Sequence, residues 1–228
     1  MMRERLRDNL RRVETRIADA CARAGRRRDA VTLIAVTKSV GVEIAAQLVE
    51  LGVHDLGENR PQELWRKAEA IAPARWHLIG HLQRNKIEQT LPMVTLIHSV
   101  DSVRLLQAIE KGATTPIDVL LEFNASGEVS KGGFAPDDVP SLVPILSELK
   151  RVQVRGVMTM AALQDPEACR PTFVMLRALR DRLQAQCPTH RIEHLSMGMS
   201  NDFEIAIEEG ATFVRLGTVL FEGMSDDP

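Results

Sequence analysis

The chain has 228 residues, of which 44% are hydrophobic and 26% are charged, and its formal net charge at pH 7 is -2. This length buries a sizeable core within one domain, and the near-neutral charge argues against attraction of nucleic acid to the whole surface. The three cysteines are odd in number and show no C-x-x-C spacing, so neither a disulfide framework nor a zinc site is indicated, and a reducing cytoplasm is favoured.

The first 28 residues predict a packed helix followed by a loop. Leu6, Leu10, Val13, Ile17 and Cys21 recur at helical spacing, and acidic residues are interleaved with the arginines, unlike in a transit peptide. No apolar run approaches the roughly 18 residues of a membrane span, so no membrane is expected as a partner. The run "GRRR" after the helix is interpreted as a solvated loop, with an anion or RNA contact as the alternative.

The rest of the chain alternates short apolar, β-rich runs with helical patterns. Eight runs predict strands, at residues 31–36, 53–56, 75–79, 94–98, 117–123, 152–157, 191–195 and 212–216. Six helical patterns lie at 42–52, 61–72, 101–112, 136–150, 166–186 and 200–210. Gly52, Gly112 and Gly210 are expected to end three of these helices in left-handed geometry.

This alternation predicts an α/β fold, a single-domain (β/α)8 TIM barrel over residues 1–228 with an extra N-terminal helix. An open doubly wound sheet is the alternative. In a barrel, the reacting groups gather at the ends of the strands. The long polar connection 124–135 is expected to be mobile or to face a ligand.

Polar residues follow the first two strands. Lys38 ends the first strand, and its ammonium either reaches into water or, partly desolvated, forms a Schiff base with an aldehyde. Glu58 and Asn59 follow the second strand, where they orient Lys38 or a ligand hydroxyl, or belong to a turn that satisfies its own backbone.

Small residues follow the last two strands, where barrels commonly hold a phosphate. These are Ser196, Gly198, Ser200, Gly217 and Thr218, whose amides and hydroxyls can donate to phosphate oxygens. The alternative is that Ser200 or Asn201 only caps the next helix, with Glu204 completing a capping box. Arg215 ends an apolar strand and needs a partner, either a structural carboxylate or a ligand acceptor such as a pyridine nitrogen.

No metal site or common nucleotide motif is indicated. His77 and His81 lie along a strand and its exit rather than on one helix face, and there is no H-E-x-x-H motif. The sequence also has no G-x-G-x-x-G, Walker or G-x-S-x-G motif, so dinucleotide, nucleotide and serine-hydrolase functions are disfavoured.

Seven segments carry a more specific signal: "AVTK", "LGENRPQEL", "WHLIGHLQRNK", "HSVDS", "GVMTMA", "LSMGMSNDFEIAI" and "VRLGT". In this order, over about residues 31–221, they resemble the pyridoxal phosphate homeostasis protein family, single-domain relatives of the alanine racemase barrel. The combination of segments is highly specific, although each one alone is weak.

The resemblance implies that the protein holds pyridoxal 5'-phosphate (PLP) as an aldimine on Lys38. It further implies that Ser196, Ser200, Gly217 and Thr218 hold the phosphate, that Arg215 faces the pyridine nitrogen, and that Asn59, His81 and Ser99 surround the ring or the lysine. A permanently cationic Arg215 disfavours protonation of that nitrogen and weakens the cofactor as an electron sink. The family is regarded as a PLP carrier and regulator of vitamin B6 and amino-acid pools without established catalysis, so no catalytic residue is assigned.

The related racemase also needs a second domain and a tyrosine base, and this chain has no tyrosine. A racemase-like enzyme using another base such as His81, or a Schiff-base lyase without PLP, is the alternative. We expect a cytoplasmic monomer with PLP-accepting apoenzymes as its partners. Val40 stands where many family members have a second lysine, and the tail "FEGM" differs from the usual ending. Lys86 and Lys131 are candidate second lysines, or ordinary exposed side chains.

Overall fold

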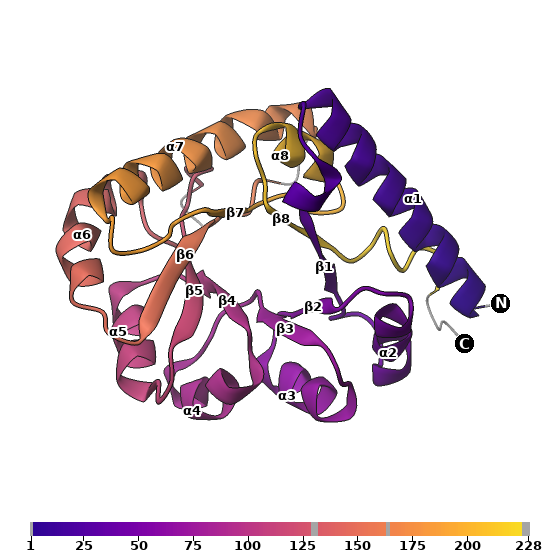
Figure 1. Cartoon of the computed structure of the whole chain (residues 1–228), viewed down its shortest axis with the longest axis horizontal. Helices are drawn as coiled ribbons and strands as arrows, with labels where there is room; N and C mark the ends of the chain where they lie inside the picture. The colour runs from indigo at the N-terminus through magenta and orange to yellow at the C-terminus, as the bar shows by residue number, and fades with distance from the viewer. Residues whose placement is uncertain (1, 129–131, 163–164, 225–228) are drawn as a thin grey trace.

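The computed structural model describes residues 2–128, 132–162 and 165–224, which form a closed barrel of eight parallel strands (Figure 1). The strands, in order around the barrel, are β1 (Thr32–Val36), β2 (Asp55–Glu58), β3 (Arg75–Leu78), β4 (Leu96–Val100), β5 (Ile117–Glu122), β6 (Val152–Met158), β7 (His194–Ser196) and β8 (Phe213–Leu216). The barrel closes where β8 pairs with β1, with Phe213 opposite Thr32. The predicted (β/α)8 barrel is therefore confirmed, and the open sheet is excluded because it would leave two edge strands.

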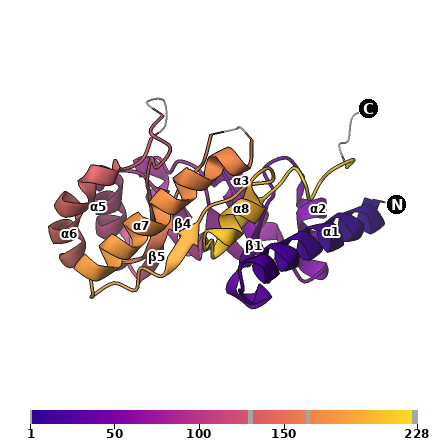
Figure 2. The same cartoon turned by 90° about the horizontal axis from the view of Figure 1, so that it is seen from above.

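Helices form the outer layer of the barrel (Figures 1 and 2). They are α1 (Met2–Arg23), α2 (Val42–Glu50), α3 (Pro61–Ala70), α4 (Ile87–Thr90), α5 (Val103–Gly112), α6 (Val139–Ser147), α7 (Arg170–Gln186) and α8 (Phe203–Glu208). Short 3-10 turns lie at Arg28–Ala30, Arg84–Lys86, Leu91–Met93, Pro136–Asp138 and Glu167–Cys169. Within the described ranges, no helix combines the length and the apolar character needed to cross a membrane.

Successive residues of each strand face the helices and the barrel interior in turn. Outward residues such as Ala35, with 0% exposure, belong to a large apolar core shared with the helices. Inward residues form only a small apolar cluster of Leu96, Leu120 and Met158, against which Phe213 packs. Several other inward positions carry polar side chains, whereas branched apolar residues usually fill such a barrel. The outward positions therefore supply most of the hydrophobic core, and the inward ones are available for chemistry.

Helix α1 packs along α8 on the outside of the barrel (Figure 1). All five residues of its predicted stripe are buried, from Leu6 at 0% exposure to Leu10 at 9%. Arg16 joins the two helices, because its Nε lies 2.7 Å from Oε1 of Glu204 and its guanidinium lies 4.6 Å from the ring centroid of Phe203. The extra N-terminal helix is thus an integral part of the outer layer.

All three arginines in "GRRR" form contacts within the molecule, Arg27 with the neighbouring Asp29. Arg26 donates to the carbonyl oxygens of Ile207 at 2.7 Å and Ala211 at 2.8 Å, near the end of α8. Arg28 pairs with Glu14 of α1 at 2.7 Å. The run therefore fastens the connection between α1 and β1 to the barrel and is not a free basic patch.

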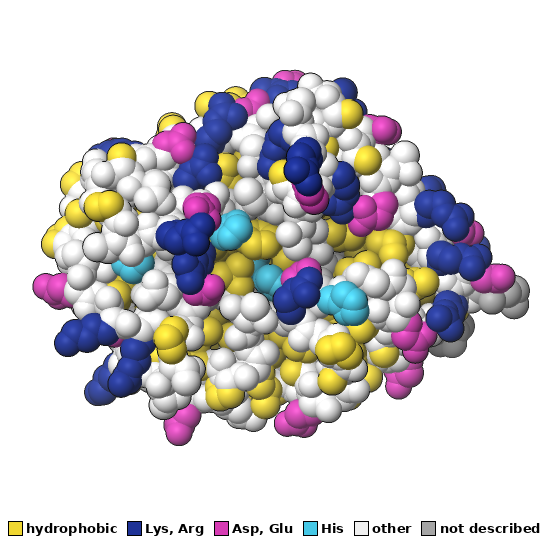
Figure 3. All heavy atoms as spheres, viewed as in Figure 1, with side chains coloured by type: hydrophobic (Ala, Val, Ile, Leu, Met, Phe, Trp, Pro, Cys, Tyr) yellow, Lys and Arg dark blue, Asp and Glu magenta, His cyan; other side chains and the backbone are white. Residues whose placement is uncertain are grey.

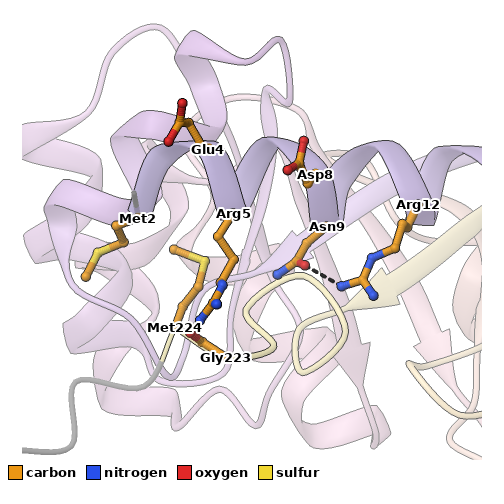
Figure 4. A pocket seen from close by; sticks show the side chains of 8 residues that line it. All are labelled: Met2, Glu4, Arg5, Asp8, Asn9, Arg12, Gly223 and Met224. Atoms are coloured by element: carbon orange, nitrogen blue, oxygen red, sulfur yellow. Dashed lines mark hydrogen bonds between the residues drawn. The ribbon is translucent and has the colours of Figure 1, made fainter.

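Side chains of α1 also hold the tail "FEGM", as Figure 4 shows for Arg5 and Asn9 near Gly223. Asn9 donates from Nδ2 to the carbonyl oxygens of Leu220 and Glu222, both at 3.0 Å. Arg5 donates to the carbonyl oxygen of Gly223 at 2.5 Å. Because these acceptors are backbone atoms, the contact does not depend on the side chains by which the tail differs from its relatives.

One helix was not predicted, and one local prediction is wrong. The four-residue helix α4 was not expected, because a single helical turn is too short to show a periodic pattern. Gly112 is the last residue of α5 and has no positive φ, whereas Gly52 and Gly210 have φ values of 92° and 102°. Ala113 follows α5 in extended geometry, so this helix ends without a left-handed residue.

Candidate functional site

Lys38 lies just beyond β1, at the mouth of the barrel where the strands end. The amide of Thr37 still pairs with β2, donating to the carbonyl oxygen of Gly57 at 2.9 Å. Lys38 itself lies in the turn that follows, where the amide of Val40 donates to the carbonyl oxygen of Thr37 at 3.1 Å. The side chain of Lys38 is exposed. Lys38 is therefore not the partly desolvated amine considered above, but it is open to an aldehyde that enters the mouth.

A buried ion pair lies behind Lys38, between the barrel and α3. Nζ of Lys67 donates to Oε1 of Glu58 at 2.5 Å and to the carbonyl oxygen of Thr37 at 2.7 Å. The Thr37 hydroxyl donates to the same Glu58 oxygen at 2.7 Å. Lys67 is 1% exposed and Glu58 is fully buried. Glu58 thus faces α3 and contacts Thr37, the residue before Lys38.

The loops after β7 and β8 are joined at this mouth. The amide of Val219 donates to Oγ of Ser200 at 3.4 Å. Neither the amide nor the hydroxyl of Thr218 has a hydrogen-bond partner among the described residues. A Cβ at Gly217 would lie 3.1 Å from the carbonyl oxygen of Val36, so a side chain there would crowd β1. These loops therefore offer free donors beside a position that favours glycine.

Ser200 does not cap the following helix. Helix α8 begins at Phe203, and its N-cap residue is Asp202, whose Oδ1 accepts from the amide of Met199 at 2.6 Å. Glu204 pairs with α1 instead of completing a capping box. The predicted cap at Ser200 or Asn201 is therefore wrong, because the loop continues two residues further and leaves the Ser200 hydroxyl facing the loop after β8.

Arg215 is buried at 4% exposure inside the barrel. Its Nη1 donates to Oγ of Ser196 at 2.6 Å, and its Nη2 donates to the carbonyl oxygen of Thr159 at 2.9 Å. No carboxylate of the described residues lies within ion-pair distance. Burial lowers the pKa of Arg215 to about 10, although the charges of Glu122 and Asp202 partly offset this effect. A guanidinium has five N–H donors, so Arg215 keeps donors for a further acceptor.

Ser196 lies inside the barrel with Arg215 rather than in the exposed loops. Its side chain is fully buried, and its Oγ is 2.8 Å from Nδ1 of His98 as well as 2.6 Å from Nη1 of Arg215. A phosphate oxygen would have to displace one of these partners to reach it. The geometry thus brings Ser200, Gly217 and Thr218 together and associates Ser196 with Arg215.

Of the remaining predicted residues, Asn59 and His81 follow β2 and β3, and Ser99 lies near the end of β4. Asn59 is half-buried against Gly80, where a Cβ would lie 2.2 Å from the Asn59 carbonyl oxygen. Ser99 is buried and donates to the carbonyl oxygen of Gly80 at 2.6 Å. His81 is exposed, with Nδ1 3.0 Å from Oδ2 of Asp101. Ser99 therefore supports the rim through its neighbour, while His81 stands in solvent.

Of the two candidate second lysines, the structure describes one. Lys86 is partly buried in a 3-10 turn after β3, and Lys131 lies outside the described residues. Over the ranges that the structure describes, no group of three or more His, Cys, Asp or Glu side chains is arranged to hold a metal ion.

Comparison with known proteins identifies the family. The model of the alanine racemase N-terminal domain matches residues 3–225. A pyridoxal phosphate homeostasis protein from Aquifex aeolicus is 44% identical over 220 residues, covering 94% of this chain and 96% of the relative. One from Pseudomonas aeruginosa is 38% identical, covering 94% of each chain. The chain belongs to the pyridoxal phosphate homeostasis protein family.

Solved structures are similar to this chain over most of its length. A crystal structure of an unknown protein from Bifidobacterium adolescentis has a TM-score of 0.89 and 38% identity, covering 96% of each chain. PipY of Synechococcus elongatus, solved with PLP bound, has a TM-score of 0.79 and 34% identity, covering 90% of this chain and 99% of that one. An alanine racemase of Clostridium difficile has a TM-score of 0.78 at 18% identity, covering 98% of this chain and 58% of that one, and this likeness shows the fold alone.

Sequence analysis missed some of the side chains that surround the site. Lys67 falls between Leu64 and Ile71 at helical spacing, so the buried face of α3 includes it, and this pattern could have revealed it. Glu122 ends β5 at the same mouth, and burial, followed by the charge of Asp101, raises the pKa of its carboxyl. Glu122 had no sequence signal, because an acidic residue at the end of a strand is usually solvated.

Proposed function

We propose that this protein holds PLP as a Schiff base with Lys38 and acts as an intracellular carrier in vitamin B6 homeostasis and amino-acid pool balance, without catalysis. One observation carries the proposal. Lys38 follows β1 at the mouth of the barrel, and Arg215 lies inside the barrel on the adjacent β8, opposite Ile34 of β1. A 34% identical relative with this fold has been solved with PLP bound.

The donors at the mouth suit the cofactor. Thr218 offers an amide and a hydroxyl without partners among the described residues, and the Ser200 hydroxyl lies beside the same loop. Such donors match phosphate oxygens, which only accept hydrogen bonds. Arg215 keeps guanidinium donors for an acceptor such as a pyridine nitrogen. We therefore assign the phosphate to Ser200, Gly217 and Thr218, and we assign Ser196 to holding Arg215.

The same residues support a carrier rather than an enzyme. Bound PLP can supply an aldehyde for exchange with amines and an electron sink for carbanions. A cationic donor opposite the pyridine nitrogen disfavours its protonation and so weakens the electron sink. The sequence has no tyrosine to serve as a base, and His81 is exposed and paired with Asp101. Retention and release of the aldehyde are therefore the chemistry that this site favours.

The first test is the ultraviolet-visible spectrum of the purified protein with PLP, before and after borohydride reduction, followed by peptide mapping. We expect a reducible absorbance band, with the reduced adduct on Lys38. Lys38→Ala should remove the band, and Lys86→Ala, which changes another lysine near the same mouth, should retain it. A protein that stays colourless when PLP is added, or an adduct mapped to another lysine, would contradict the proposal.

Catalysis and partners are tested separately. Absence of deuterium incorporation at the α-carbon of a broad panel of amino acids would agree with a carrier, whereas incorporation that Lys38→Ala abolishes would establish a racemase-like enzyme. Transfer of PLP to apoenzymes, measured by the activity they regain, tests the proposed partners.

Light scattering tests the proposed monomer. Localisation in the cytoplasm agrees with the three cysteines, each buried and without a disulfide partner.

A further inference from the structure

A chain of buried polar side chains runs through the interior of the barrel, from Arg215 to the opposite mouth. Below Arg215 and Ser196, Nε2 of His98 lies 3.0 Å from Nδ1 of His77. Nε2 of His77 lies 3.1 Å from Oδ1 of Asp55. His98 is 0% exposed and His77 is 3% exposed. Barrel interiors are usually filled by layers of apolar side chains, so a continuous polar path needs an explanation.

The chain ends at the mouth where the strands begin. Asp55 accepts from Nε of Arg75 at 2.7 Å and from its Nη2 at 2.5 Å. Asp55, Arg75 and His77 line a cavity at this end together with Phe213 of β8. Figure 3, which looks onto this end, shows histidine and charged side chains around a central hollow. The path therefore connects the cofactor end of the barrel to an ion pair near solvent at the other end.

The donor and acceptor at each step follow from the two ends. Burial alone would raise the pKa of Asp55, but hydrogen bonds from His77 and Arg75 outweigh it and lower the pKa to about 2. The ionised Asp55 only accepts, so His77 must carry its proton on Nε2. At the other end, Oγ of Ser196 contacts Arg215, which only donates, and Nδ1 of His98, so the Ser196 hydroxyl donates to His98. His98 then carries its proton on Nε2 and donates to Nδ1 of His77.

The last step completes the order. Burial is the main cause that lowers the pKa of His98 well below its ordinary value, so its ring is neutral. With its proton on Nε2, His98 accepts at Nδ1, and the Ser196 hydroxyl must donate to it. The oxygen of Ser196 is then free to accept from Arg215, which is a permanent donor. Every link therefore donates in one direction, from Arg215 to Asp55.

We propose that Ser196, His98, His77 and Asp55 act as one positioning chain for Arg215, fixing its guanidinium and the direction of its hydrogen bonds toward the bound cofactor. Asp55, the carboxylate at the other end of the chain, is paired with Arg75, and three hydrogen-bonded side chains separate it from Arg215. Arg215 is thus held without a carboxylate beside it that would compete with a pyridine nitrogen. This inference rests on the proposed PLP function for its consequence, although the chain itself can be tested without PLP.

The first experiment is nitrogen-15 NMR of the histidine rings in the full chain without PLP. We expect His98 and His77 both to be neutral at pH 7 with the proton on Nε2. His98 charged, or protonated on Nδ1, would overturn the proposed direction even if PLP binds as proposed. A wild-type protein that does not bind PLP, yet shows the expected tautomers, would overturn the function and leave the chain intact.

The second experiment adds PLP to two variants of His77. His77→Leu interrupts the chain, and we expect about tenfold weaker PLP binding, the equivalent of losing one hydrogen bond to a charged group, with a shifted absorbance maximum. His77→Gln can accept from His98 and donate to Asp55, so it should retain most of the affinity and the wild-type spectrum. His54→Leu, on the same face outside the chain, is the matched control. Equal behaviour of folded His77→Leu and His77→Gln would overturn the positioning role.

Discussion

The buried pair behind Lys38 gives the most direct test of the energetics of this site. Lys67→Met removes an ammonium that is 1% exposed and leaves the fully buried Glu58 with the Thr37 hydroxyl as its remaining donor. Breaking a buried ion pair in this way costs about 3–5 kcal/mol. The carbonyl oxygen of Thr37 also loses its bond to Lys67, so the expected value lies toward the upper end of this range.

The assay is urea unfolding at pH 7, followed by tryptophan fluorescence. With an m-value of about 2–3 kcal/mol/M, the midpoint of Lys67→Met should fall by about 1–2 M. Lys67→Met/Glu58→Leu, which removes both charges, should recover at least about half of the loss, because no unpaired buried charge remains. Lys111→Met, an exposed lysine on α5, should change stability by less than about 0.5 kcal/mol. A loss below about 1 kcal/mol for Lys67→Met, or additive single variants, would refute this account of the pair.

Three other predictions follow from the site and the fold. Asp55 has a folded-state pKa of about 2 against an ordinary 3.8, so its ionised form adds about 2 kcal/mol to the free energy of unfolding. This stabilisation is complete above about pH 5 and is lost as the pH falls toward 2. Asp55→Asn should therefore lack this loss of stability in acid unfolding. Asn9→Ala leaves two carbonyl oxygens of the tail without their donor and should lower the free energy of unfolding by about 1–3 kcal/mol. Amide exchange at residues 219–224 should become faster, whereas an exposed control such as Arg11→Ala should leave it unchanged. Gly198 has a φ of 93°, and Gly198→Ala places a Cβ 2.7 Å from the Cβ of Ala206. The substitution should therefore lower the melting temperature and weaken PLP binding. An unchanged affinity for PLP would show that the loop after β7 does not set the phosphate site.

The barrel was predictable because its signal is repeated along the chain. Each strand contributes an outward residue to one apolar core, as Ala35 of β1 and Leu56 of β2 do at 0% exposure, and such runs are visible without knowledge of their neighbours. Lys38 and Thr218 could be placed at one mouth for the same reason, because all strands of a parallel barrel end on the same side. The sequence therefore predicted the positions that the order and direction of the strands bring together.

The rest of the site depends on orientation, which no local pattern specifies. Ser196 and Ser200 are four residues apart in one motif, yet one is fully buried beneath Arg215 and the other faces the loop after β8. The strand alternation turns Ser196 inward, and its predicted contact with the phosphate stays a prediction. His77 and His98 lie on neighbouring strands, and no local pattern indicates their contact. Their 3.0 Å contact joins β3 and β4 across the interior, and 21 residues separate them in sequence.

The division between outward and inward positions explains how a polar interior can coexist with a stable barrel. Burying charged groups without partners is costly, and here Arg215 donates to Ser196 and to the carbonyl oxygen of Thr159, while Asp55 at the other end of the chain is paired with Arg75. The chain thereby satisfies Arg215 without a carboxylate that would neutralise it near a ligand. The outer core, which is independent of these residues, supplies the hydrophobic stabilisation. A variant that interrupts the chain should therefore affect the bound cofactor more than the fold, which is the outcome that separates a positioning role for His77 from a structural one.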